Sequence, residues 1–139
     1  MDSLEAHRAY LEAEWLAAQA APLSARKAML VAMLVDAYVD RLFAARPDAE
    51  DILVFRDDTA AGSPALGLIM ALCAQRGVWL VTEAVAVPIA DYGALGVEDF
   101  MVSLYNDHSV QRLLLALPDG GRRDMLEVLD EAIAALEAP

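Results

Sequence analysis

Two adjacent carboxylates, Asp57 and Asp58, follow the short apolar segment 52–56 and are the residues most suited to chemistry. If that segment is a parallel strand, both lie at its carboxyl end, where ligand crevices open in α/β sheets. Their oxygens could hold Mg²⁺, and Ser63 at the start of a following helix could help to bind a phosphate. The spacing matches neither a P-loop nor a GxGxxG fingerprint. We therefore favour an ordinary turn and keep a small metal-dependent or phosphate-binding α/β enzyme using these aspartates as the alternative.

Two further polar residues, Glu83 and His108, are candidates because of where they stand in the pattern. Glu83 lies in the middle of the Val-rich segment 78–87, so it needs a basic partner if that face is covered. Arg112 on a neighbouring strand is the candidate partner, and if the segment is instead an exposed edge strand, Glu83 needs none. His108 lies in the polar run 105–109, where it could act as a base beside a carboxylate, although a loop or helix cap needs such residues anyway. Both join the two aspartates as a candidate polar site.

The other reactive residue types indicate packing and not catalysis. Cys73 lies inside an apolar stretch, where a helix would bury it as a small hydrophobic residue. Asp36 and Asp40, four residues apart, share one helix face, which we interpret as the solvated stripe of that helix. The alternative is that Asp36, which interrupts an apolar run, is buried and needs a partner or a raised pKa. His7 falls on the apolar face of its helix and is expected to be a partly buried packing residue. One cysteine and two histidines fit none of the usual zinc spacings, so we predict no metal site, no cofactor and no catalytic residue.

Composition and charge narrow the possible partners. The chain has 139 residues, 58% of them hydrophobic, so it suits one domain, 1–139, and is too apolar for disorder. Twenty-two acidic against ten basic residues give a net charge of -12, which disfavours nucleic acid and anionic membranes. The longest apolar stretches, 28–35 and 65–74, are shorter than a membrane span, and acids stand where a signal peptide carries positive charge. We expect a soluble, cytoplasmic protein, and the Ala- and Arg-rich usage suggests a bacterial one.

Periodicity and capping signals predict the secondary structure. The helices that we expect run over 3–20, 24–45, 64–75 and 123–137. The segment 78–87 is the clearest strand. Because a lone strand leaves its backbone groups unpaired, we also assign 110–117 to a strand, although helix formers fill it. The segments 52–56 and 97–105 stay open between strand and helix.

These elements predict an α+β fold, in which an N-terminal helical pair and further helices pack on a small sheet. The alternative is a mostly α-helical chain with a minor hairpin. The second helix, capped by Ser24, is apolar around its whole circumference over 28–35 and must therefore be surrounded. It is either the central helix of the monomer or a helix that leaves part of its surface for a second copy of the chain.

No motif names a reaction, so the functional prediction rests on association. We predict a non-enzymatic protein that acts by self-association as a homodimer, or by binding a protein whose basic patch complements the negative charge. The contact surface that we expect combines the second helix with the apolar flank of the first. Its adaptable or anchoring side chains would be Trp15, Met29, Met33 and Tyr38.

Overall fold

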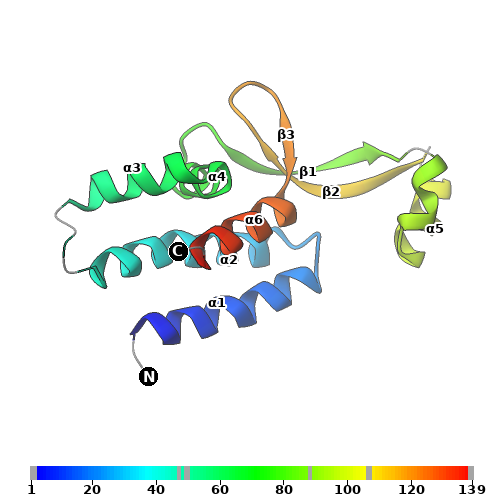
Figure 1. The fold of residues 1–139 in the computed structure, drawn as a ribbon. Coiled ribbons are helices and arrows are strands. Elements are labelled where there is room, and N and C mark those ends of the chain that lie inside the picture. Colours follow the sequence, from blue (N-terminus) through cyan, green and yellow to red (C-terminus); the bar gives the residue numbers. More distant parts are fainter. Residues whose placement is uncertain (1–2, 47, 49–50, 88, 106–107, 138–139) are drawn as a thin grey trace.

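The computed structural model describes residues 3–46, 48, 51–87, 89–105 and 108–137, and the fold is α+β with a small antiparallel sheet (Figure 1). The elements in chain order are α1 (Ser3–Gln19), α2 (Ala25–Ala44), α3 (Ile52–Gly62), α4 (Pro64–Cys73), β1 (Trp79–Ala86), the 3-10 helix η1 (Ile89–Ala94), α5 (Val97–Tyr105), β2 (Ser109–Ala116), β3 (Arg122–Asp124) and α6 (Met125–Glu137). The predicted fold class is confirmed.

The helix α2 lies among the other helices of the molecule. Ser24 caps it as predicted, because its backbone is extended and its hydroxyl accepts a hydrogen bond from the Lys27 N–H at 3.2 Å. The helices α1, α3, α4 and α6 all contact α2, and Val31, Val35 and Val39 are fully buried. Much of the apolar circumference is therefore covered within one subunit. Met33 is the exception, since it stays 55% exposed.

Both predicted strands form, and they pair with each other. β1 and β2 are antiparallel in a register that runs from Trp79 opposite Ala116 to Ala86 opposite Ser109. A third strand, β3, was not predicted, because the sequence analysis assigned 123 onwards to the last helix. The backbone of residues 122–124 pairs with the end of β2, and α6 begins only at Met125.

The two segments left open are both helical. The segment 52–56 belongs to α3, which Asp51 caps by accepting the Leu53 N–H at 2.8 Å. Ser63 ends α3 and caps α4, whose first residue is Pro64. The segment 97–105 is α5. Because 52–56 is helical, Asp57 and Asp58 do not stand at the carboxyl end of a parallel strand, and that part of the enzyme alternative is wrong.

The hydrophobic core lies between one face of the sheet and the helices. Leu113 and Leu115, which alternate along β2 and so share a face, are buried in one cluster with side chains of α2, α4 and α6. Away from this cluster the β1–β2 hairpin continues and carries α5 at its far end, apart from the layer of helices (Figure 1). We call β1, η1 and α5, residues 79–105, the arm. Among the described residues, no helix is both long and apolar enough to cross a bilayer.

Candidate functional site

The four residues of the predicted polar site lie on different elements. Asp57 and Asp58 are exposed on α3, Glu83 is half-buried in the middle of β1, and His108 is exposed in the turn before β2 with a φ of 59°. Figure 1 places α3 and α5 at opposite ends of the molecule. In the part of the chain that the structure describes, no group of three or more His, Cys, Asp or Glu side chains is placed to hold a metal.

Glu83 has a basic partner, but not the one expected. Its Oε1 lies 2.7 Å from Nε of Arg122 at the start of β3. Arg112 does stand opposite Glu83 in the β1–β2 register. Its Nη2, however, lies 3.0 Å from Oδ2 of Asp99 on α5. Glu83 and Asp99 are therefore both compensated within the chain, and the predicted Glu83–Arg112 pair is wrong because each member has a nearer partner.

Asp36 and Asp40 of α2 both pair with the guanidinium of Arg56 on the neighbouring helix α3. Arg56 of α3 pairs through Nη2 with Oδ1 of Asp36, and its Nη1 lies 2.8 Å from Oδ1 of Asp40. Burial alone would lower the pKa of the guanidinium, but the hydrogen bonds to both carboxylates outweigh it and raise that pKa. Asp40 is exposed, as the interpretation of a solvated stripe predicts, whereas Asp36 is partly buried and has the basic partner that the alternative requires. Asp36, Asp40 and Arg56 together form a clamp that attaches α3 to α2. A prediction of helix for 52–56 would have pointed to this contact.

Cys73 behaves as the sequence predicts. Its side chain is partly buried against the core cluster. Burial raises the pKa of its thiol to about 11, and the negative charge of Asp36 adds to the shift. Because only the thiolate is a good nucleophile, the residue is a packing side chain at neutral pH.

The four residues of the predicted contact surface do not gather on one exposed face. Tyr38 is only 5% exposed, and its ring meets the His7 ring edge-on at 5.4 Å between centroids. Trp15 and Met29 are half-buried against the core, and only Met33 is largely exposed. His7 is the partly buried packing residue that was expected. Its Nδ1 accepts from Arg41, so its Nε2–H donates to the Leu34 carbonyl at 2.7 Å.

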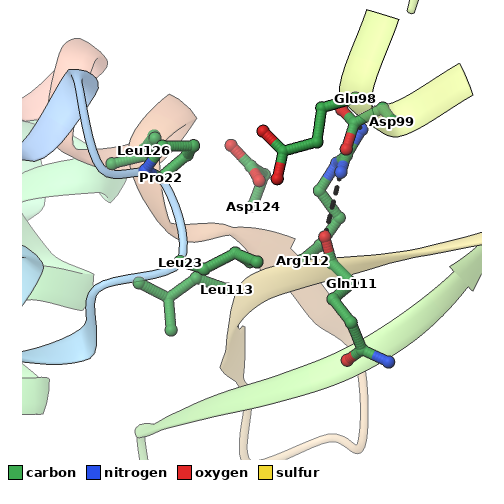
Figure 2. A pocket seen from close by; sticks show the side chains of 9 residues that line it. All are labelled: Pro22, Leu23, Glu98, Asp99, Gln111, Arg112, Leu113, Asp124 and Leu126. Atoms are coloured by element: carbon green, nitrogen blue, oxygen red, sulfur yellow. Dashed lines mark hydrogen bonds and ion pairs between the residues drawn. The ribbon is translucent and has the colours of Figure 1, made fainter. Parts of the chain in front are cut away.

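A cavity of about 500 Å³ opens between the helical layer and α5 (Figure 2). Its wall has two parts. The apolar part comes from the α1–α2 loop, β2 and α6, and the polar part comes from α5, β2 and β3. The lining residues are Pro22, Leu23, Glu98, Asp99, Gln111, Arg112, Leu113, Asp124 and Leu126. Figure 2 shows Pro22 and Leu126 on one side of the opening, with Glu98 and Asp99 on the other.

The polar side of this cavity is already largely engaged in structural contacts. Asp99 pairs with Arg112, and Oδ2 of Asp124 accepts the Glu127 N–H at 2.9 Å, which caps the start of α6. With three carboxylates and one guanidinium in its wall, the cavity has the chemistry to favour a small cation with an apolar body over an anion. The sequence analysis did not single out this cavity, because its residues come from four separate segments that no motif connects.

A second unusual feature is the apolar surface of the arm. Five large apolar side chains of α5 are exposed, as are two of β1: Val97, Phe100, Met101, Val102, Leu104, Trp79 and Val85. The sheet order is β1-β2-β3, so β1 is an edge strand. Most of its residues are exposed. Sequence reasoning missed this surface because it left 97–105 open.

None of the family models, curated proteins or solved structures compared with the chain matches it. Function is therefore inferred from the geometry of the chain itself.

Proposed function

We propose that this chain is a non-catalytic protein that acts by associating with a second copy of itself through the arm. The orientation of α5 is the observation that carries the proposal. Val97, Phe100, Met101 and Leu104 follow the i, i+3, i+4, i+7 spacing of a helical stripe, which in an ordinary surface helix faces the core. Here the stripe faces outward, with Val97 83% and Leu104 50% exposed.

The inner side of α5 is polar and satisfied. Ser103 is 0% exposed, and its hydroxyl donates to the Phe100 carbonyl at 2.9 Å. On the same helix, Asp99 pairs with Arg112 of β2. The Asp99–Arg112 pair therefore links α5 to the sheet, while the hydrogen bond of Ser103 stays within α5 and the apolar stripe stays in water. Exposed apolar surface of this kind marks an interaction site more often than a tolerated surface.

Charge favours a second copy over a basic partner at this surface. The chain carries a net charge of -12, so a basic protein would be drawn to carboxylates that are free to pair with it. In the arm, Glu83 and Asp99 already have arginine partners from the same chain. Asp91 and Glu98 are also exposed in the arm, but the stripe of α5 is apolar and the single charge of β1 is paired. The matching apolar surface that this protein itself supplies is another arm. Symmetric pairing of one patch with its own copy is the commonest form of oligomer.

The test is the molar mass in solution, measured by light scattering after size exclusion over a wide series of concentrations. The wild-type protein should reach twice its 15.0 kDa. The double variant Met101→Glu/Leu104→Glu places two charges on the stripe, at side chains that are already exposed, and should stay monomeric. Leu16→Glu changes an exposed leucine on α1, which is not part of the arm, and serves as the matched control. A wild-type protein that is monomeric throughout, or a stripe variant that dimerises as well as the control, would refute the proposal.

A further inference from the structure

The outer edge of β1 indicates how two copies of the chain could associate. β1 pairs with β2 on one side, and no other strand of the described residues lies on its opposite side. Antiparallel strands alternate between residues that direct both backbone groups at the neighbour and residues that direct both away. Two observations show which residues of β1 point outward, one at each end of the ladder.

At one end, the N–H of Val87 donates to the carbonyl of His108 at 2.6 Å. These two residues continue the β1–β2 register, so Val87 and every second residue before it point toward β2. At the other end, the N–H of Leu117 donates to the Gly121 carbonyl at 2.9 Å, which directs Leu117 and Leu115 toward β3. Leu114 then points toward β1, in agreement with the first observation.

The backbone groups of Leu80, Thr82, Ala84 and Ala86 therefore face the open side of β1. Thr82, Ala84 and Ala86 are exposed and Leu80 is half-buried, so this edge is accessible. The strand also lacks the usual devices that protect an edge, since it contains neither proline nor lysine. Its one charge, Glu83, is compensated by Arg122.

Resting on the self-association proposed above, we infer that two copies join by antiparallel pairing of their β1 edges, with Thr82 on the two-fold axis. Symmetry and the outward direction of the even-numbered residues restrict the register. Two registers give the longest overlap of the strands. One places Thr82 opposite Thr82 over 79–85, and the other places Glu83 opposite Glu83 over 80–86.

Charge decides between these registers. Like charges directly opposite each other on neighbouring strands are destabilising, which disfavours Glu83 opposite Glu83. With Thr82 on the axis, two threonines face each other and can hydrogen-bond, while Glu83 faces Val81 of the second copy. Each Glu83 keeps its own Arg122. The contact then joins two three-stranded sheets into one continuous sheet without burying a free charge.

The register is tested by disulfide trapping in a Cys73→Ala background, which removes the chain's only native cysteine. Facing residues of a hydrogen-bonded antiparallel pair have Cα atoms about 5.5 Å apart, within the range of a disulfide. Thr82→Cys should therefore yield a covalent dimer under mild oxidation. Ala84→Cys is the matched control, because in this register the two Ala84 residues are out of step by roughly 13 Å along the strands. Faster linking of Ala84→Cys or of Glu83→Cys would overturn the inference.

Hydrogen exchange tests the same pairing without new cysteines. In the dimer, the amides of Leu80, Thr82 and Ala84 should be protected, and they should lose that protection on dilution or in the Met101→Glu/Leu104→Glu variant. The amides of Val81 and Val85 bond to β2 in either state and are the internal control. If the wild-type protein dimerises but Thr82→Cys does not link and these amides stay unprotected, the edge pairing is refuted while the proposed function stands. A monomeric wild-type protein refutes the proposed function itself.

Discussion

Arg56→Ala should loosen the attachment of α3 to α2, while the packing of α3 on α4 remains. None of the residues of α3 is fully buried, so this helix has little apolar packing of its own. Its attachment to α2 consists of the Arg56 clamp on Asp36 and Asp40 and of the Phe55 ring. That ring lies 5.6 Å from the Phe43 ring and beneath the Arg46 guanidinium. The alanine removes the clamp and leaves the ring contacts in place.

The expected loss follows from how exposed each half of the clamp is. Asp40 is 52% exposed, so its pair with Arg56 contributes only about 0.2–1 kcal/mol. Asp36 is 27% exposed, and a hydrogen bond to a charged group in such a site contributes about 1.5–3 kcal/mol. Taking the lower part of both ranges, Arg56→Ala should reduce the free energy of unfolding by about 2 kcal/mol. For a domain of this size, that corresponds to a fall of roughly 6–10 °C in melting temperature.

Urea unfolding at fixed protein concentration measures this loss, because association would add a concentration dependence. Arg26→Ala is the matched control. Arg26 is exposed on α2, and no ion pair to it is found among the described residues, so its loss should stay within about 0.5 kcal/mol. A cycle with Asp36→Asn should show clear coupling to Arg56, and one with Asp40→Asn only weak coupling. If Arg56→Ala costs no more than Arg26→Ala, or if Asp40 couples more strongly than Asp36, the clamp does not hold α3 in the way described.

Three further outcomes follow from the same contacts. Cys73, with its thiol pKa raised to about 11 from 9.0, should react slowly with iodoacetamide at pH 8 until urea is added. Since the folded pKa exceeds the unfolded one, its contribution to stability is complete below pH 9 and declines as the pH rises through 11, and Cys73→Ala should lack this decline. Leu129→Ala opens a cavity at a fully buried site and should cost about 3–4 kcal/mol in urea unfolding, against little change for exposed Leu16→Ala. The dimer should strengthen with added salt, because salt screens repulsion between two chains of charge -12, whereas weakening with salt would show that attraction between opposite charges holds the two copies together and would contradict an apolar interface.

The need of a strand for a backbone partner predicted more of the fold than the secondary-structure propensities of the residues did. The residues of β2 are mostly helix formers, yet β1 needed a partner, and that requirement assigned 110–117 correctly. β3 could not be predicted from the sequence because it is so short. Its three residues stand directly before α6, where capping and strand signals overlap. The segment 52–56 is an apolar run too short for periodicity to separate a strand from the start of a helix.

The partners of charged residues were the least predictable part of the site. Sequence reasoning recognised that Glu83 needs a cation, and register placed Arg112 opposite it. The choice of Arg122 instead depends on β3 and on Asp99 of α5, which draws Arg112 away. Side-chain pairing of this kind is fixed only once three separate elements are in place. The same holds for Arg56, whose position opposite Asp36 requires α3 to be helical and packed on α2.

The outward stripe and the open edge of the arm are best understood together. A chain that needed only a stable monomer would gain by turning Val97 and Leu104 toward its own core, since buried apolar area favours folding by about 25 cal/mol per Å². The ion pair of Asp99 with Arg112 of β2 holds α5 in the opposite orientation. It does so at the far end of a hairpin whose edge carries no unpaired charge. An orientation that leaves apolar area in water, fixed by a specific ion pair, is what a surface reserved for another molecule requires, and the self-complementary edge of β1 makes a second copy the partner that fits.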